Sequence, residues 1–176
     1  MSSTYAEYVL FEQHSQVRHE FLDGEIYAMA GGTPEHAVAL RLIGNQLPSG
    51  CRTYTSDLRI RIAKSDLTTY PDGAVICGKV APAANDQLAA TNPTLIVEVT
   101  SPSTEAYDRG AKLDHYRSLD SLREIVIVAH DTQCIDVHRR GRDGKWSIVT
   151  SRAGETVGLD SIGGSLRVAD VYAALS

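Results

Sequence analysis

The sequence predicts a mixed α/β domain, an α+β fold with a central mixed sheet and helices packed on it. Apolar runs of strand length, such as residues 94–99, alternate with two segments of helical spacing near 34–47 and 104–118. An Asp-Gly pair between the β-prone runs 19–22 and 25–28 is typical of a two-residue hairpin. The chain has 176 residues, 43% of them hydrophobic and 22% charged, so it is long enough to bury a core. Because no repeat or low-complexity linker divides it, we expect one domain over residues 1–176.

The first elements follow from caps and turns. Residues 4–13 are expected to form a helix capped by Ser3 or Thr4, with Tyr8 and Phe11 on one side. The Asp-Gly turn predicts a hairpin register that pairs Phe21 with Ile26 and Glu20 with Tyr27. The next helix is expected to start at Thr33-Pro34-Glu35 and to turn four residues toward the core: His36, Leu40, Ile43 and Leu47.

The rest of the chain is expected to be mostly β, with a second helix over 104–118 capped by Ser103 or Thr104. We expect the segment 79–92 to be a long loop and the C-terminus to end in a short helix over 168–175. Strands are predicted at 51–56, 58–63, 74–77, 94–99 and 124–129, followed by a hairpin of 134–139 with 145–150.

Composition restricts the class of protein. A net charge of -5 counts against a surface that is basic throughout. The Arg59/Arg61 pair and a cluster around 139–145 are expected to lie on a solvated surface. Three widely spaced cysteines argue against a disulfide framework and against a structural zinc site. The apolar stretches are too short to cross a bilayer, and the N-terminus lacks secretion-signal features, so we expect a cytoplasmic protein.

Carboxylates are the candidates for chemistry, because phosphate-loop, dinucleotide, nucleophile-elbow and zinc motifs are absent from the sequence. Glu98 interrupts the apolar run 94–100, and burying a carboxylate there is costly unless it is paired or bound to a cation. The alternative is a half-exposed strand with Glu98 in water. Asp72 lies in a Pro-Asp-Gly string, which by itself can be an ordinary turn before a strand.

Taken in order, these pieces resemble the PD-(D/E)XK superfamily, and more closely the Uma2 family of bacterial restriction-endonuclease-like proteins. The resemblance covers most of residues 4–172. The matching strings are His19–Ile26, Pro34–His36, Ser56–Ile62, Tyr70–Asp72, Val97–Thr104, Tyr107–Lys112 and Tyr116–Arg117. The resemblance implies a restriction-endonuclease-like core with flanking helices and extra β-hairpins.

The same resemblance implies divalent-metal hydrolysis of DNA phosphodiesters. Asp72 and Glu98, with the Val99 carbonyl, would hold Mg²⁺, for which Mn²⁺ is a plausible substitute. Thr100 stands where the usual E-x-K pattern has lysine, so Lys112 on the next helix is expected to assist the attacking water. Glu20 and His36 are further candidate site residues, with a plain hairpin position and a core position as their alternatives. Gly73 also replaces the more usual β-branched residue and is expected to loosen the strand.

Three functions remain open on this evidence. The first is a Mg²⁺-dependent endonuclease acting on DNA, for which a homodimer is attractive because two strands need two sites. The second is a catalytically inactive nucleic-acid-binding or protein-interaction module on the same fold, which the acidic charge and the missing E-x-K lysine favour. The third is a small-molecule hydrolase, for which the sequence offers no nucleophile motif.

Overall fold

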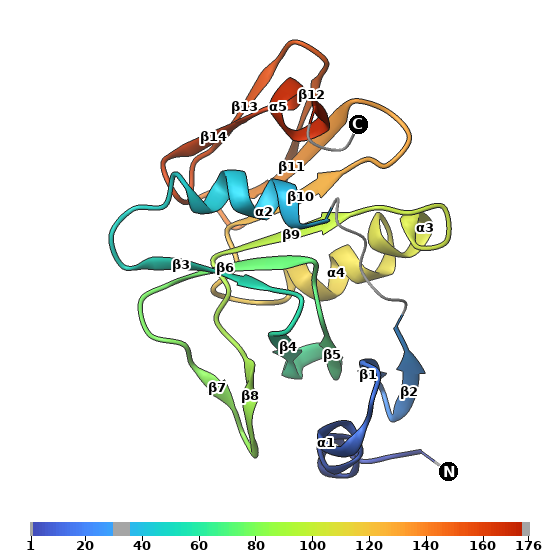
Figure 1. Cartoon of the computed structure of the whole chain (residues 1–176). Coiled ribbons are helices and arrows are strands. Elements are labelled where there is room, and N and C mark those ends of the chain that lie inside the picture. The colour runs from blue at the N-terminus through green and yellow to red at the C-terminus, as the bar shows by residue number, and fades with distance from the viewer. Residues whose placement is uncertain (1, 30–35, 174–176) are drawn as a thin grey trace.

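The computed structural model describes residues 2–29 and 36–173 and is built around two six-stranded sheets (Figure 1). The central sheet is mixed: β9 and β10 run parallel, and the other neighbours are antiparallel. Its strands, in spatial order, are β12 (Trp146–Arg152), β11 (Cys134–Arg140), β10 (Glu124–Val128), β9 (Leu95–Val99), β6 (Gly73–Cys77) and β3 (Cys51–Thr55). The predicted mixed α/β fold is therefore confirmed.

The second sheet lies beside the central one and carries the N-terminal hairpin. Its strands, in spatial order, are β2 (Glu25–Ala28), β1 (His19–Leu22), β5 (Leu67–Thr69), β4 (Arg59–Ile62), β8 (Asp86–Ala90) and β7 (Pro82–Ala83). The hairpin has the predicted register, with Phe21 opposite Ile26 and Glu20 opposite Tyr27. Asp23 and Gly24 both take positive φ, as a type I′ turn requires.

Helices cover both faces of the central sheet (Figure 1). On one face α2 (His36–Gly44), α5 (Val168–Ala173) and the hairpin of β13 (Thr156–Leu159) with β14 (Gly164–Arg167) enclose the larger core. On the other face α4 (Ala111–Arg117) follows α3 (Glu105–Asp108), and its Leu113 and Tyr116 pack against Ile96 and Ile125. The strands that carry or adjoin Asp72 and Glu98 are thus flanked by both predicted helices.

The first helix, α1 (Tyr5–His14), begins with a capping box in which Thr4 and Glu7 satisfy each other's backbone N–H groups. The buried residues of this helix are Tyr8, Val9 and Glu12. Phe11 is 47% exposed and lies edge-on to the His19 ring.

Three strands of the β-rich half were not predicted. The predicted loop 79–92 contains the hairpin of β7 and β8, with Asn85 at positive φ in its turn, and β5 was not anticipated. Alanine, asparagine and proline are poor strand formers, so no local pattern marked this hairpin. Pairing of β8 with β4 supplies the hydrogen bonds that local propensity did not predict.

The predicted helix over 104–118 is two helices separated at Gly110. A Cβ at Gly110 would lie 2.7 Å from the carbonyl oxygen of Ala106, so the chain can approach α3 this closely only with glycine there. The last turn of α3 and the start of α4 are consequently offset, although Asp108 and Lys112 still meet across the break.

Two predictions were wrong, one about the cysteines and one about the Arg59/Arg61 pair. Cys51 and Cys77 form a disulfide, because the antiparallel register of β3 and β6 places them directly opposite each other. Arg59 and Arg61 do not lie on a solvated surface: Arg59 is 3% exposed and bound to Asp86, and Arg61 is bound to Asp66. Both outcomes depend on contacts between residues far apart in sequence, the β3–β6 strand pairing and the Arg59–Asp86 ion pair, which the local sequence pattern does not predict.

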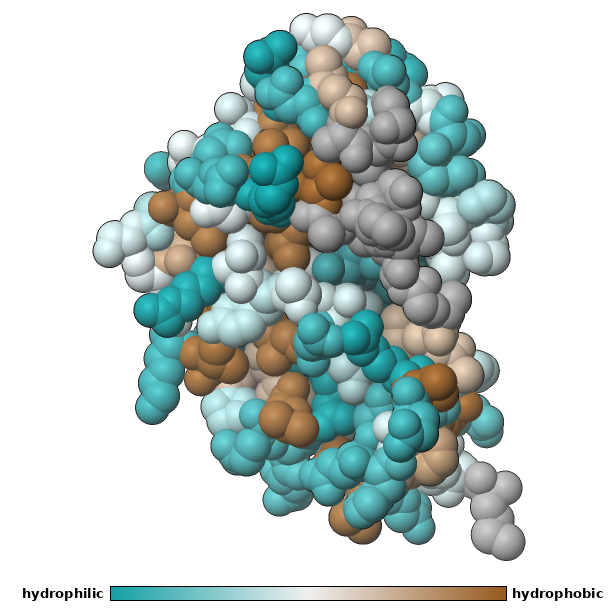
Figure 2. All heavy atoms as spheres, viewed as in Figure 1, coloured by the Kyte–Doolittle hydropathy of each residue, from teal (hydrophilic) through white to brown (hydrophobic). Residues whose placement is uncertain are grey.

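On the face shown in Figure 2, apolar side chains are interspersed among hydrophilic ones over the lower half, around α1, β7 and β8. Within residues 2–29 and 36–173, no helix has the length and apolar composition needed to cross a membrane. The cytoplasmic location and the single domain over 1–176 stay predictions.

Candidate metal centre

Asp72 and Glu98 meet at one end of the β6–β9 pair. Gly73 lies opposite Val97 in this antiparallel register, so Asp72, just before β6, lies beside the end of β9. The backbone N–H of Asp72 donates to Oε2 of Glu98 at 3.3 Å, and the N–H of Val99 donates to Oδ2 of Asp72 at 2.7 Å. Glu98 therefore accepts from the backbone of Asp72, which is 26 residues away in sequence, and Asp72 accepts from the backbone of Val99, the residue after Glu98.

Glu98 is buried, so the alternative of a solvated strand carboxylate is excluded. Its residue is 3% exposed in a strand whose five members are all buried. Oε1 accepts a hydrogen bond from the Tyr116 hydroxyl at 2.5 Å and lies 2.8 Å from Nζ of Lys112. A buried carboxylate requires such partners, because losing its hydration without them is costly.

Lys112 reaches this carboxylate from α4. The residue is 5% exposed, and its Nζ also lies 3.3 Å from Oδ1 of Asp108. Because residues four apart share a helix face, Tyr116 lies on the same side as Lys112 and approaches the same oxygen of Glu98. Lys112 is therefore buried beside Glu98 and does not face solvent.

Burial and neighbouring charges shift the ionisation of the cluster. Burial raises the pKa of Glu98 to about 7; Lys112 opposes this rise, and the carboxylates of Asp72 and Asp108 add to it. Burial by itself lowers the pKa of Lys112, but Glu98, Asp108 and Glu20 raise it above its ordinary value. The ammonium group therefore stays charged, while Glu98 holds its proton more tightly than an exposed glutamate does.

The structure brings Asp72, Glu98 and Lys112 together and sets Glu20 at their edge. Glu20, on β1, accepts a hydrogen bond from the Tyr107 hydroxyl at 3.4 Å, and Lys112 lies 5.8 Å from the centre of the Tyr107 ring. The side chain of His36 lies outside the described residues, so its place near the site stays a prediction.

Sequence reasoning missed three members of the cluster: Tyr107, Asp108 and Tyr116. Asp108, Lys112 and Tyr116 are each four residues apart, a spacing that puts them on one helix face. Tyr116 is a core residue and a partner of Glu98 at once. An aromatic residue that follows a candidate lysine by one helical turn was the signal that could have found it.

Comparison with known proteins shows the family of this chain. The family model Uma2, described as "Putative restriction endonuclease", matches residues 5–169. The chain belongs to the Uma2 family. Two Synechocystis proteins are similar to this chain over most of its length. "Uncharacterized protein slr1290" is 38% identical over 175 residues, covering 97% of this chain and 91% of that protein. "Uncharacterized protein sll1609" is 32% identical over 162 residues, covering 89% and 91%.

A solved structure shares the Uma2 fold. It is the "Crystal structure of a putative nuclease belonging to DUF820" from Anabaena variabilis, with a TM-score of 0.75 and 16% sequence identity. The match covers 97% of each chain. At this identity the likeness concerns the fold, which is the mixed α/β arrangement described above.

The two departures of this Uma2 chain from the usual pattern have structural counterparts. Thr100, in the place of the E-x-K lysine, is 1% exposed, and its hydroxyl bonds with Nδ1 of His130 at 2.9 Å. The Cβ of any larger residue at Gly73 would lie 2.5 Å from Cδ1 of Leu40, so glycine there makes room for α2 on the sheet. The expectation of a loosened strand was wrong, because β6 is paired on both sides.

Another group of ligand-type atoms lies beyond β9 and β10 in the described part of this Uma2 chain. Side-chain atoms of Glu105, His130 and Asp131 lie within 4.8 Å of one another. Glu105 is bound to Arg109, and His130 is bound to Thr100. These contacts account for the group without an ion, and exposed acids of this kind are common.

Proposed function

We propose that this Uma2 protein is a Mg²⁺-dependent endonuclease that hydrolyses DNA phosphodiester bonds, with Mn²⁺ as an alternative ion. The observation that carries the proposal is the convergence of Asp72, Glu98 and Lys112 from two paired strands and the helix packed on them. Two carboxylates from neighbouring strands with an ammonium group beside them are the groups that metal-assisted phosphodiester hydrolysis requires.

The donor set suits a hard divalent ion. Mg²⁺ prefers carboxylate, carbonyl and water oxygens at about 2.1 Å, and Asp72, Glu98 and the Val99 carbonyl offer such oxygens. The pKa of Glu98 stays raised although Lys112 lies 2.8 Å away, because burial and two further carboxylates outweigh one ammonium group. Additional positive charge beside Glu98 would therefore stabilise its ionised form.

Each residue then has a separate task. A bound divalent ion would neutralise charge on the phosphate and supply an activated water. Asp72 and Glu98 would hold that ion, and Asp72 is itself oriented by the Val99 N–H. Lys112, charged at neutral pH, would orient the attacking water and stabilise the negative charge that develops on phosphate oxygens. Tyr116 would keep Glu98 in position.

The alternative is an inactive module that binds DNA or protein on the same fold. It is favoured by one observation: Oε1 of Glu98 is already occupied by Lys112 and Tyr116, which gives the cluster a structural purpose without a metal. A buried, hydrogen-bonded ion pair can serve stability or specificity alone.

Nicking of supercoiled plasmid tests the proposal. Wild-type protein should nick with Mg²⁺ or Mn²⁺ and not with EDTA. Asp72→Asn and Glu98→Gln should each lose nicking while their circular dichroism stays that of the wild type. Asp114→Asn, which changes an exposed carboxylate on the same helix as Lys112, is the matched control and should keep full activity. Activity retained in Asp72→Asn or Glu98→Gln would remove that residue from the mechanism.

Two further expectations go with the nuclease. DNA is the proposed partner, and duplex cleavage would be served by a homodimer that presents one centre to each strand. Sedimentation equilibrium of the purified protein, with and without a duplex, measures the assembly directly.

A further inference from the structure

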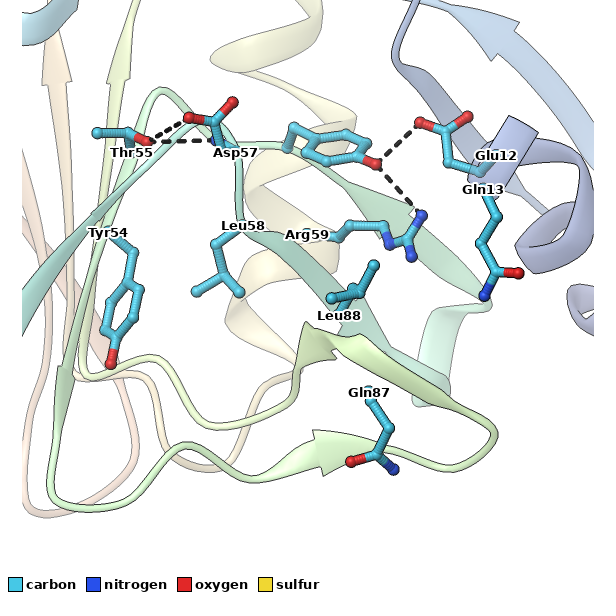
Figure 3. Close-up of a pocket in the computed structure, with 10 residues that line it drawn as sticks. Glu12, Gln13, Tyr54, Thr55, Asp57, Leu58, Arg59, Gln87 and Leu88 are labelled. Atoms are coloured by element: carbon cyan, nitrogen blue, oxygen red, sulfur yellow. Dashed lines mark hydrogen bonds between the residues drawn. The ribbon is translucent and has the colours of Figure 1, made fainter. Parts of the chain in front are cut away.

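A pocket of about 480 Å³ lies between α1, the β3–β4 turn and the hairpin of β7 and β8 (Figure 3). Its volume falls within the roughly 300–1,000 Å³ that small-molecule pockets usually have. Its walls are largely apolar, with Tyr54, Leu58 and Leu88 turned toward the space in Figure 3. Gln13 of α1 and Gln87 of β8 stand at its edge and offer amide donors and acceptors.

The floor of the pocket is polar but has its charges paired. Arg59 donates to Asp86 at 3.0 Å and to the Tyr70 hydroxyl at 3.3 Å, and that hydroxyl donates to Glu12 at 2.8 Å. Glu12 also bonds with His19, and Asp57 is bound by Arg18. A phosphate would meet two carboxylates here and no cation without a partner among the described lining residues, so the pocket suits a neutral ligand.

One donor on this floor lacks a partner. The Nε group of Arg59 is buried and has no hydrogen-bond acceptor among the described residues. The residue as a whole is 3% exposed. Buried polar groups are almost always satisfied, so the hydrogen bonding of this polar floor is incomplete at Arg59.

The pocket adjoins the metal centre. Tyr70, in its lining, precedes Asp72 by two residues, so their Cα atoms lie at most about 7 Å apart. Thr55, at its other side, is the register partner of Gly73, the residue after Asp72. A DNA strand with a phosphate at Asp72 and Glu98 would therefore have a neighbouring base within reach of the pocket.

We propose that this pocket receives one unpaired base of the DNA strand whose phosphate lies at Asp72 and Glu98. The inference rests on the proposed nuclease function and adds a base-binding site to it. A nucleobase is flat, neutral and apolar on its faces, with donors and acceptors on its edge, which matches apolar walls and a polar floor with amides at the rim. Leu58 and Leu88 contact its faces, and Gln13 and Gln87 contact its edge.

Strand binding by a wall variant tests the proposal. Leu88 is 62% exposed and forms a wall, while Leu10, on α1 outside the pocket, is 61% exposed and is a matched control. Fluorescence anisotropy is measured in EDTA with two labelled strands of one length, a thymidine homopolymer and an abasic strand. Leu88→Asp should weaken binding of the thymidine strand about tenfold, because a charged side chain then replaces an apolar wall against which the base packs. It should leave the abasic strand unchanged, and Leu10→Asp should change neither.

Each outcome decides between the pocket and the nuclease. Equal binding of both strands by wild type, no binding of either, or equal effects of Leu88→Asp and Leu10→Asp would overturn the base pocket. Plasmid nicking that persists in that case leaves the nuclease standing. Base-dependent binding that Leu88→Asp removes, in a protein that never nicks with Mg²⁺ or Mn²⁺, supports the pocket and rejects the nuclease. Unchanged circular dichroism of both variants ensures that only the surface has changed.

Discussion

Replacing Lys112 by methionine tests the electrostatics of the metal centre. Methionine keeps most of the length of the apolar stem and removes the ammonium group that lies 2.8 Å from Glu98 and 3.3 Å from Asp108. All three residues are at most 5% exposed, so water cannot replace the lost cation without rearrangement. Removing one partner of a buried ion pair costs about 3–5 kcal/mol. In a domain of this size Tm falls by about 2–4 °C for each kcal/mol of stability lost, so Lys112→Met should lower Tm by roughly 6–20 °C.

Urea denaturation followed by circular dichroism at pH 7 in EDTA measures this loss directly. The matched control is Lys64→Met, because Lys64 and its partner Asp120 are 60% and 82% exposed and solvent screens that pair. The control should denature at the wild-type urea concentration. If Lys112→Met also loses less than about 1 kcal/mol, the reasoning is refuted, since this is the range of exposed pairs and not of buried ones.

Three further outcomes follow from single features. The pKa of Glu98 rises from its ordinary 4.5 to about 7, so the folded chain binds that proton more tightly than the unfolded chain does. In EDTA the free energy of unfolding should therefore fall as pH rises from 4.5 to about 7, and urea titrations of Glu98→Gln should lack this part of the slope. Gly73→Val should destabilise the protein by about 1–3 kcal/mol through its clash with Leu40. In urea titrations, the double variant with Gly73→Val and Leu40→Ala should lose less stability than the sum of the losses in the two single variants, because Leu40→Ala removes the clash. Thiol titration of the denatured, unreduced protein should find one reactive thiol, and three after reduction, because Cys51 and Cys77 are joined; three thiols before reduction would contradict the disulfide.

Local contacts explain why part of the fold was predictable. The Asp23-Gly24 turn and the Thr4 cap act between residues a few positions apart, so the hairpin register and the first helix follow from short strings. Strand alternation likewise placed Glu98 on the face opposite Val97, and that face is the one covered by α4. The sequence still left open whether this face is exposed to water, because alternation predicts which way a side chain points and not whether another element covers it.

The candidate site depended on order along the chain as well as on chemistry. Asp72, Glu98 and Lys112 were predicted from a sequence of motifs, and the pairing of β6 with β9 together with the packing of α4 brought them into contact. Tyr116 and Asp108 complete the cluster through contacts with Glu98 and Lys112 that no motif described.

The sequence by itself determined the mixed α/β class, the hairpin register and the acidic residues available for a metal. Only the tertiary structure decided that Glu98 is buried, that Cys51 and Cys77 meet, and that Arg59 lies beneath a pocket and not on the surface. The physical reason is the range of the interactions. Caps, turns and alternation act within a few residues, whereas burial and strand pairing join groups 26 or 27 positions apart, a separation that leaves no periodic trace in the chain.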